Sequence, residues 1–413
     1  MLKAISLFSG VGGLDFGFEA AGFHTAVAVE MDKYCCKTMR ENREWTVIEK
    51  PIENVTTSEL LEAANLKVGE ADVLIGGPPC QPFSKMGYWS NGDSKRLSDP
   101  RAGTLVQYLR VLEEAQPKAF LLENVQGISY SDKDDGFKLL LDGIEQINKR
   151  TGLNYSISYN VLNASEYGVP QHRNRFFLIG SRDGKVFKFP APTHTDYSKL
   201  KDSPFFAGVT DKLPLNTAWD AFTDLPEDTR YDLNIGGKWA ELLPSVPEGE
   251  NYLWHTERKE GKNLFGWRTR YWNFLLKLGK EQPSWTIAAQ PGSATGPFHW
   301  DNRRLSAAEM GRLQTFPDGI QYAGPFREVQ RMIGNAVPSH LGEILATEIK
   351  SQFWGITKPT SYKLAPVKNP KKAPKPKLSD VPTKYLDLIG VYDAHPGTGK
   401  GPKGKVADVA IRE

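Results

Sequence analysis

Short apolar runs alternate with amphipathic runs from the first residues onward, and this alternation constrains the fold more than any other feature. The strand-length apolar runs are residues 3–9, 25–30, 72–75 and 119–123. The helix-length amphipathic runs are residues 14–21, 33–44, 104–116 and 136–150, and strand-like runs return at 155–162 and 175–182. Strands that alternate with helices form parallel sheets covered on both faces. The sequence therefore predicts an α/β fold with a doubly wound, mostly parallel sheet.

This regular pattern ends near residue 185 and divides the chain into four parts. Residues 1–184 form the first domain in this interpretation, and residues 185–300, rich in Pro, Gly, Trp and charged residues, form a smaller irregular domain. Helical patterning returns in 301–356, which we expect to pack back on the first domain. Beyond it, 357–413 is rich in Lys and Pro and is expected to be an extended tail.

The composition is that of an ordinary globular protein. The 413 residues are 39% hydrophobic and 24% charged, which is enough to bury a large core. The net charge is only +3, so a nucleic-acid surface would have to come from local clustering of basic residues. Three cysteines, no metal-ligand spacing, no signal peptide and no membrane-length apolar run predict a soluble, cytoplasmic protein without a metal.

The stretch ADVLIGGPPCQPFS places a cysteine at the end of an apolar strand. Two glycines and two prolines end the strand abruptly, because proline cannot donate to a sheet ladder. Cys80 is therefore expected on a stiff loop at a strand's carboxyl end, where ligands bind in open α/β sheets. A buried cysteine that acts only as a small hydrophobic residue is the alternative.

The stretch LFSGVGGLDFG follows the first strand and opens the first helix. Its glycines allow a ligand to approach the backbone, and the helix start offers free N–H groups. It departs from the dinucleotide fingerprint, because Asp15 stands where the third glycine of that motif is expected. Glu30 ends the second strand, where an acidic residue can accept hydrogen bonds from ribose hydroxyls. These features favour an adenosine-containing cofactor, with a simple tight turn as the alternative.

With these residues in place, the sequence resembles the DNA (cytosine-5) methyltransferase family of restriction-modification systems. The resemblance runs in family order over most of residues 3–350. Its motifs are LFSGVGG, GGPPCQPFS, LLENV, QHRNR, RRLSAAEMGRLQTFPD and IGNAVP. It implies a Rossmann-like class I methyltransferase fold with a smaller target-recognition domain, and S-adenosylmethionine as the methyl donor, with S-adenosylhomocysteine as product.

The resemblance also implies how the catalytic residues act. Cys80 would attack carbon 6 of a cytosine that is flipped out of double-stranded DNA, which activates carbon 5 for methylation. Glu123 would donate a proton or hydrogen bond to ring nitrogen 3, for which burial has to raise its pKa. Arg175 would contact the cytosine carbonyl and a nearby phosphate, and Arg173 would help to hold the catalytic site.

The resemblance assigns a set of residues to the cofactor. These residues are Phe8, Ser9, Gly10, Gly12, Gly13, Glu30, Met31, Asn54, Pro79, Leu105, Asn335 and Ala336. Two positions depart from the family pattern. Asn54 stands where an aspartate usually contacts the adenine amine, and Met31 stands where an aromatic residue often packs on the adenine.

Contacts with DNA are expected from two regions. Near the catalytic residues the candidates are Gln81, Ser84, Gln171 and Arg175. In the irregular domain, the stretch WRTRYW places Arg268 and Arg270 among aromatic residues, and arginine favours guanine in the major groove. A surface salt bridge is an equally simple role for these two arginines. The Lys- and Pro-rich tail could add non-specific phosphate affinity or could be a solvated extension.

Two other functions remain open at this point. One is methylation of transfer RNA by the same chemistry, and the other is DNA binding by a relative that has lost catalysis. We expect a monomer associated with the nucleoid, with double-stranded DNA as substrate and a cognate restriction endonuclease acting separately.

Overall fold

The computed structural model describes residues 1–79, 103–129, 135–197, 211–226, 228–267 and 271–391. Cys80, Gln81, Ser84, Arg268 and Arg270 lie outside these residues. The chain forms two compact units. Unit 1 comprises Met1–Leu233, Lys280–Gln290 and Leu305–Ala373, and unit 2 comprises Asn234–Gly279, Pro291–Arg304 and Pro374–Glu413. The segment 185–300, which the sequence assigns to a target-recognition domain, is thus divided between the two units.

Unit 1 is built on a seven-stranded sheet with the order β3-β2-β1-β4-β5-β7-β6. The strands are β1 Leu2–Leu7, β2 Phe23–Glu30, β3 Val47–Glu49, β4 Val73–Gly76, β5 Ala119–Val125, β6 Ser158–Asn163 and β7 Asn174–Ser181. The pairs from β3 to β5 are parallel, and β7 runs antiparallel to both β5 and β6. The predicted doubly wound, mostly parallel sheet is confirmed.

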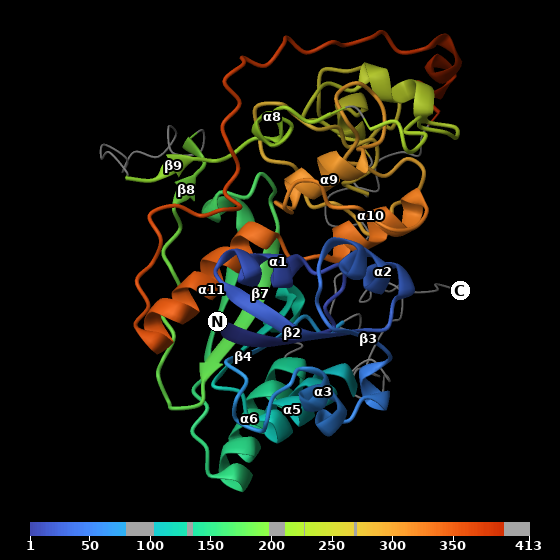
Figure 1. Ribbon diagram of the computed structural model, residues 1–413. Coiled ribbons are helices and arrows are strands. Elements are labelled where there is room, and N and C mark those ends of the chain that lie inside the picture. The colour runs from blue at the N-terminus through green and yellow to red at the C-terminus, as the bar shows by residue number, and fades with distance from the viewer. Residues whose placement is uncertain (80–102, 130–134, 198–210, 227, 268–270, 392–413) are drawn as a thin grey trace, which may run out of the picture. The chain divides into compact units, whose positions relative to one another are not determined.

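Helices cover both faces of the sheet (Figure 1). On one face lie α1 Gly13–Ala20 and α11 Ser339–Trp354, and on the other lie α3 Thr57–Ala63, α5 Gly103–Ala115 and α6 Asp135–Thr151. The remaining helices of unit 1 are α2 Lys33–Asn42, α8 Ala218–Ala221, α9 Ala307–Leu313 and α10 Phe326–Asn335, with the 3-10 turns η1 Ile52–Asn54, η4 Gln126–Ser129 and η5 Ala164–Tyr167. A small second sheet pairs β8 His194–Thr195 with β9 Leu213–Pro214.

Alternation along each strand explains the two layers. In β4, Val73 and Ile75 pack with α1 and α11, whereas Leu74 between them packs with α5 on the opposite face. The register is firm because both faces are buried, so that a slip by one residue would move every side chain to the wrong layer. Close packing on the α1 face also needs a glycine, because a Cβ at Gly17 would lie 2.4 Å from the Ser339 carbonyl oxygen.

Unit 2 has irregular structure around its own hydrophobic core. Its helical turns are η6 Ala240–Ser245, η7 Tyr252–His255 and η8 Thr383–Leu388. The core residues are Leu242, Leu243, Val246, Tyr252, Leu264, Phe265, Leu275, Phe298 and Tyr385. Tyr385 comes from the Lys- and Pro-rich region near the end of the chain, so part of the predicted tail belongs to this core. In the described part of the chain, no helix is both long and apolar enough to cross a membrane.

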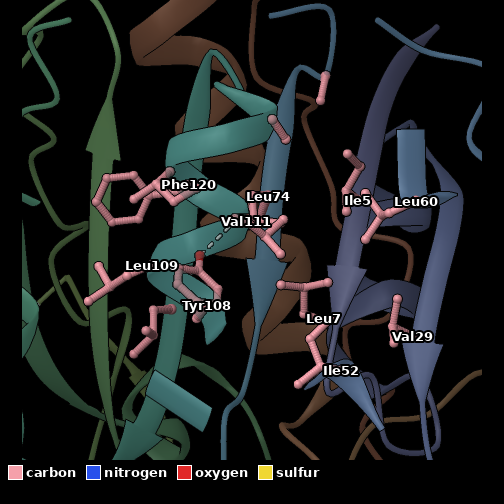
Figure 2. Close-up of a cluster of buried hydrophobic side chains, with 14 of the residues drawn as sticks. Ile5, Leu7, Val29, Ile52, Leu60, Leu74, Tyr108, Leu109, Val111 and Phe120 are labelled. Atoms are coloured by element: carbon pink, nitrogen blue, oxygen red, sulfur yellow. Dashed lines mark hydrogen bonds between the residues drawn. The ribbon is translucent and has the colours of Figure 1, made fainter. Parts of the chain in front are cut away.

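A buried tyrosine joins the sheet to α5. Tyr108 is 1% exposed, and its hydroxyl lies 3.2 Å from the Leu74 carbonyl oxygen and 3.0 Å from the Leu121 carbonyl oxygen (Figure 2). Burial raises the pKa of this hydroxyl well above its usual value, so it stays a donor. One side chain therefore bonds to the two central strands, β4 and β5.

We expect Tyr108→Phe to lower the free energy of unfolding of unit 1 by about 1–2 kcal/mol, because it removes the donor and leaves the buried carbonyls partly unsatisfied. Urea unfolding followed by circular dichroism measures this loss. Tyr159→Phe is the matched control, since Tyr159 is 53% exposed and should change stability little. Equal stability of the two variants would contradict the role assigned to the Tyr108 hydroxyl.

Candidate functional site

The strand order determines where a ligand can bind. The chain winds outward from β1 through β2 to β3 on one side and continues through β4 and β5 on the other, so the direction of winding reverses between β1 and β4. Ligands of open α/β sheets bind beyond the carboxyl ends of the strands at such a switch point. The loops that leave β1 and β4 begin at Phe8 and Gly77. Both loops were singled out by the sequence.

The loop after β1 is held in a left-handed backbone conformation. Phe8, Gly10 and Gly12 have φ values of 52°, 55° and 86°. The Gly12 N–H donates to the Ser9 carbonyl at 2.9 Å, and the Ser9 hydroxyl lies 2.9 Å from that of Ser6. A Cβ at Gly10 would meet nothing within 4 Å, so the backbone at this glycine faces open space. The loop can therefore receive a ligand against its main chain.

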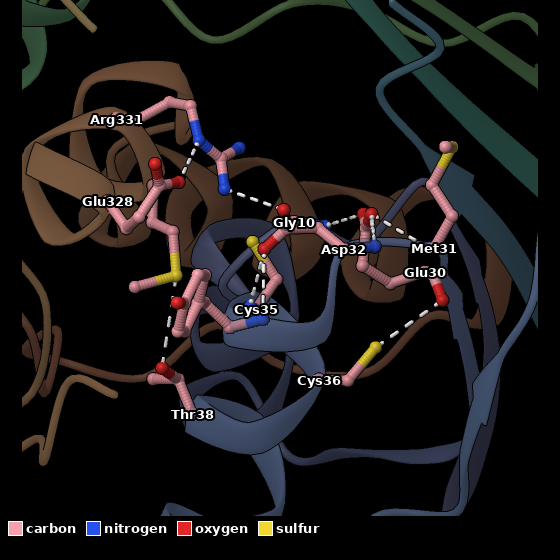
Figure 3. Close-up of polar contacts among 11 residues, drawn as sticks. Gly10, Glu30, Met31, Asp32, Cys35, Cys36, Thr38, Glu328 and Arg331 are labelled. Carbon is pink, nitrogen blue, oxygen red and sulfur yellow. Dashed lines mark hydrogen bonds and ion pairs between the residues drawn. The ribbon is translucent and has the colours of Figure 1, made fainter. Parts of the chain in front are cut away.

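Glu30 connects this loop to the end of β2 (Figure 3). One carboxylate oxygen accepts the Gly10 N–H at 2.8 Å, and the other accepts the Met31 and Asp32 N–H groups at 2.8 and 2.9 Å. Burial raises the pKa of Glu30, although these three hydrogen bonds oppose the shift. A carboxylate has about four acceptor positions, so the side chain can still accept a ligand hydroxyl.

Asp32 and Arg331 form a contact that the sequence did not indicate. Asp32 caps α2 by accepting the Tyr34 and Cys35 N–H groups, and its other oxygen lies 2.6 Å from Arg331 Nη2. Arg331 also pairs with Glu328 at 2.7 Å (Figure 3). Because Arg331 lies on α10, the ion pair fixes the helix that ends at Asn335. No sequence signal marks two residues that lie 299 positions apart.

The predicted catalytic carboxyl group is buried beside two arginines. Glu123 lies in β5 and is 9% exposed, and its Oε1 lies 2.8 Å from Nε of Arg175 in β7. Burial raises the pKa of Glu123, while Arg175 and Arg173 oppose the shift by favouring the carboxylate. The antiparallel pairing of Val125 with Arg175 brings these side chains together. The fold therefore brings Glu123, Arg173 and Arg175 together, and their roles in catalysis stay predictions.

Arg173 connects this group to the end of α10. Its side chain is 1% exposed, and its Nη2 donates to the carbonyl oxygens of Gly334 and Ala336, each at 2.8 Å. Gln314 Nε2 donates to the Ile333 carbonyl at 2.8 Å and so holds the same turn. Within the described residues, Arg173 Nε and Nη1 have no hydrogen-bond partner. Gln314 lies in the motif RRLSAAEMGRLQTFPD, and no role was predicted for it from the sequence.

The chain leading to Cys80 is fixed by side chains of the neighbouring elements. Asn124 Nδ2 donates to the Pro78 carbonyl at 3.2 Å, and the Thr104 hydroxyl donates to the Pro79 carbonyl at 3.2 Å. A Cβ at Gly77 would lie 2.9 Å from Oε2 of Glu123. Only glycine at this position lets the carboxyl group approach the loop closely. From the sequence, a role was predicted for Glu123 of the ENV triplet but none for Asn124.

The other two cysteines are unsuited to act as nucleophiles. Cys35 and Cys36 are buried on α2, and burial raises the pKa of both thiols, that of Cys36 to about 12. Nearby acidic groups, with Glu30 first among them, raise the pKa values further. A thiol that stays protonated is a poor nucleophile.

The remaining predicted residues lie in different environments. Met31 is 68% exposed, and Asn54 and Asn335 are also exposed, as is Pro79. Leu105 is 1% exposed and packs in the core beneath the sheet. Gly13 is packed closely against another part of the chain, because a Cβ at this position would lie 2.4 Å from the Val337 carbonyl oxygen. This glycine therefore lets α1 approach the chain beside Ala336.

Gln171 is fully buried rather than open to solvent. Its Nε2 donates to the Leu313 carbonyl at 3.2 Å, and its Oε1 accepts the Ile287 N–H at 3.3 Å. In this structure the side chain connects three segments of unit 1. Contact of Gln171 with DNA stays a prediction.

Asp15 is a further buried acid next to the glycine loop. It lies on α1 with no exposed surface, and its Oδ1 accepts the Thr25 hydroxyl at 3.2 Å. Burial raises its pKa to about 6, and the hydrogen bonds from Ser6 and Thr25 oppose the shift. In the sequence, Asp15 was noted only because it stands where the dinucleotide motif has its third glycine, and no role was predicted for it. Elsewhere among the described residues, no three His, Cys, Asp or Glu side chains gather in a way that could hold a metal ion.

Comparison with known proteins identifies the family. The family described as C-5 cytosine-specific DNA methylase matches residues 2–351. The chain belongs to this family. It is 42% identical over 377 residues to the type II methyltransferase M.SacI of Streptomyces achromogenes, covering 85% of this chain and 93% of the relative. M.NgoFVII of Neisseria gonorrhoeae is 31% identical over 341 residues, covering 81% of this chain and 83% of that protein.

Solved structures agree with this DNA methylase fold. A triple mutant of DNMT2 from Spodoptera frugiperda has a TM-score of 0.58 at 16% identity, covering 84% of this chain and 99% of that structure. The methyltransferase EhMeth of Entamoeba histolytica has a TM-score of 0.55 at 15% identity, covering 85% and 98%. These likenesses show the fold. The family and the type II relatives show that the enzyme is a DNA (cytosine-5) methyltransferase of the restriction-modification type.

We expect the stability of this methyltransferase to depend on pH through Asp15. The folded pKa of about 6 lies above the ordinary value of 3.8, so the contribution of Asp15 to stability is most favourable below pH 4 and falls as the pH rises to 6. The fall amounts to roughly 3 kcal/mol, at about 1.4 kcal/mol per pKa unit. Asp15→Asn removes this titration.

Urea unfolding at pH 4 and pH 7 tests this expectation. The variant should gain stability relative to the wild type by roughly 3 kcal/mol between the two pH values. A constant difference between the two proteins would show that Asp15 does not titrate in this range.

Proposed function

We propose that the enzyme methylates carbon 5 of a flipped-out cytosine in a short sequence of double-stranded DNA, with S-adenosylmethionine as donor and a covalent Cys80 adduct as intermediate. The observation that carries the proposal is the buried pair of Glu123 and Arg175 beside the Gly77 loop that leads to Cys80. Carbon 5 of cytosine is too electron-poor to attack a methyl donor directly. A thiolate that adds to carbon 6 removes this obstacle.

Cys80 is the nucleophile in this proposal because the alternatives on α2 are buried with raised pKa values. In the sequence, Cys80 comes four residues after the end of β4. Ligands of open α/β sheets bind beyond such carboxyl ends of strands. The Cys80 thiolate forms a bond to carbon 6, and the same bond breaks when the carbon 5 proton leaves. The loop that leads to Cys80 leaves β4 beside Glu123, a group that can act on the same ring.

Glu123 acts on ring nitrogen 3 as the thiolate attacks. Burial raises the pKa of Glu123 and so favours its protonated form, and a protonated carboxyl group can donate to the nitrogen as electron density builds on the ring. Arg175 lies 2.8 Å from the same carboxyl group and holds its orientation. A guanidinium at this position can also donate to the cytosine carbonyl oxygen.

The residues at the switch point fit S-adenosylmethionine. When it is bound, S-adenosylmethionine supplies the electrophilic methyl carbon. Gly10 offers open space against the backbone, and Glu30 is an acceptor for the ribose hydroxyls at the end of β2. Asn335 is exposed at the end of α10, which is held by the ion pair of its Arg331 with Asp32 and by the hydrogen bond of Arg173 to Gly334. The remaining assigned cofactor residues, Phe8, Ser9, Gly12, Gly13, Met31, Asn54, Pro79, Leu105 and Ala336, complete the proposed site.

Unit 2 reads the DNA target in this proposal. Its sequence carries 16 Lys and Arg residues against 11 Asp and Glu, whereas unit 1 has 36 against 38, so the positive charge of the chain is concentrated in the smaller unit. Tyr271 and Trp272, next to Arg268 and Arg270, are 79% and 49% exposed. Exposed aromatic residues beside basic residues suit contacts with DNA bases and phosphates.

Tyr271 also has a backbone conformation that is unfavourable for a non-glycine residue, with φ of 68°. The buried Asn251 fixes the turn by donating to the Trp272 carbonyl at 2.9 Å, and the Phe274 N–H donates to the Tyr271 carbonyl at 2.8 Å. Such strain persists where the surroundings enforce it, often at binding sites. We infer that this turn presents its aromatic side chains to the target.

We also infer that the enzyme acts as a monomer, beside a restriction endonuclease that is a separate protein.

Bisulfite sequencing of mixed-sequence duplex DNA, after incubation with the enzyme and S-adenosylmethionine, tests the substrate and the target together. Protected cytosines in one shared short sequence are the expected result. Protection of transfer RNA instead of duplex DNA would move the substrate to RNA and overturn the target proposal.

We expect Cys80→Ala to abolish transfer of a labelled methyl group while DNA binding stays within about threefold of the wild type, because only the attacking atom is lost. Cys36→Ser is the matched control, since it keeps a donor for the Glu30 carbonyl and should retain activity. Electrophoretic mobility shift and methyl-transfer assays measure the two properties. Substantial activity in Cys80→Ala would remove the proposed nucleophile.

We expect Arg173→Lys to weaken cofactor binding by about tenfold, because the lysine nitrogen ends one bond short of the Nη2 position from which both the Gly334 and Ala336 carbonyl groups are bound. Calorimetric titration with S-adenosylhomocysteine measures the dissociation constant. Arg182→Lys is the control. Arg182 follows the end of β7 opposite to Arg173, and it also donates to two backbone carbonyl groups, those of Gly69 and Gln116. If the two variants bind the cofactor equally well, Arg173 does not position the cofactor site.

A further inference from the structure

The Lys- and Pro-rich region after α11 has no assigned role, and it lies beyond the residues 2–351 that the family matches. Residues 357–391 of this region, which we name the C-terminal strap, are described by the structure. The strap is extended except for η8. Its first part belongs to unit 1 and its second part, from Pro374, belongs to unit 2. The strap is thus a covalent connection between the two units.

The first part of the strap is bound by buried carboxylates of unit 1. Glu343 on α11 is 2% exposed, and its two oxygens accept the Lys363 and Leu364 N–H groups at 2.7 and 2.9 Å. Lys358 pairs with Glu348 of the same helix at 2.5 Å. Buried carboxylates need such partners, because an unpaired buried charge is costly. The strap therefore supplies hydrogen bonds and charge partners to two buried acids of α11.

A second anchor lies on α8. Asp220 accepts the Asn369 N–H and the Lys368 ammonium group, each at 3.0 Å. Asn369 Nδ2 donates to the Trp219 carbonyl at 3.1 Å, and the Trp219 indole N–H donates to the Lys371 carbonyl at 2.7 Å. Main-chain and side-chain groups of the strap are both used. A tail that is only solvated has no reason to make this set of contacts.

The second part of the strap supplies a core residue of unit 2. Tyr385 is 3% exposed, and its ring stacks on Trp239 with centroids 5.9 Å apart and an interplanar angle of 15°. Its hydroxyl donates to the Lys238 carbonyl at 2.7 Å. The Ser379 N–H donates to the Pro244 carbonyl at 3.1 Å, and Lys384 lies 2.6 Å from Glu241. The strap therefore packs against the segment that begins unit 2.

We propose that the strap holds the target-reading unit in its own folded arrangement, with Tyr385 as the positioning residue that completes its hydrophobic core. The inference rests on the proposed role of unit 2 in reading DNA. Tyr385 acts through Trp239 and does not touch the reacting atoms. Its loss should therefore weaken the use of the target sequence, and it should leave cofactor binding in unit 1 unchanged.

A different role for the same region, non-specific attraction of phosphates by lysines, makes another prediction. Lys371, Lys372, Lys375 and Lys377 are exposed on the strap. If they provided the main effect, neutralising them would weaken binding to all DNA sequences equally and would flatten the salt dependence. Loss of the Tyr385 ring would instead reduce the discrimination between the target and other sequences.

The test compares Tyr385→Ala, Tyr385→Leu and Tyr385→Phe in the full chain, together with the variant in which Lys371, Lys372, Lys375 and Lys377 are all changed to Ala. For each protein we would measure kcat and KM for a target duplex, the affinity for a non-target duplex, and the dissociation constant of S-adenosylhomocysteine. We expect Tyr385→Ala to raise KM for the target at least about tenfold with the cofactor constant unchanged. Tyr385→Phe, which keeps the ring, should stay within about threefold of the wild type.

Each outcome supports or overturns the inference. An unchanged KM in Tyr385→Ala, or an equal loss in the lysine variant, overturns it. If Tyr385→Ala does not fold, Tyr385→Leu gives the decision, because it keeps apolar volume in the core and should still raise KM more than Tyr385→Phe. If the wild type methylates no shared sequence, the proposed function fails. If it does so while the Tyr385 variants match it, only the inference about the strap fails.

Discussion

The buried guanidinium of Arg173 is the contact on which the arrangement of unit 1 depends most. It connects the start of β7 to a turn that lies 161 residues later in the chain. At one end it lies beside Glu123 and Arg175, and at the other it fixes the carbonyl groups of Gly334 and Ala336. Burial and the charge of Arg175 act against its ionised form, which makes a precise set of partners necessary. One side chain therefore couples the carboxyl group proposed to act in catalysis to the segment proposed to bind the cofactor.

The parts of the fold that the sequence predicted are those with local signals. The apolar runs of β1, β2, β4 and β5 and the amphipathic run of α5 are regular enough to be read directly, and glycine and proline mark the loops that follow β1 and β4. The fold brings Glu123, Arg173 and Arg175 together, and the catalytic roles that the family resemblance implies for them stay predictions. Short elements such as β3 and α3 were not predicted, because three to seven residues carry little periodic signal. The helix α10 was also missed, although Val329, Met332 and Ile333 recur at helical spacing along it.

The missed residues have a common cause. Arg331, Gln314 and Asn124 act through partners on other elements, so their roles depend on tertiary contacts that no local pattern encodes. Tyr385 was hidden for a similar reason. Its surroundings are rich in Lys and Pro, a composition that indicates an extended segment but not what the segment packs against. An extended conformation and a buried anchor are compatible, and only the packing distinguishes the strap from a solvated tail.

The discontinuity of unit 2 limits how the unit proposed to read the target can be transferred to another enzyme. The unit is assembled from three stretches of chain, and the last of them follows the whole of unit 1. A transfer of residues 234–304 alone into a related enzyme would carry the exposed aromatic turn but would leave Trp239 without the ring that stacks on it. Recombination at a single pair of boundaries therefore cannot move the proposed reading unit together with the strap residue that completes its core.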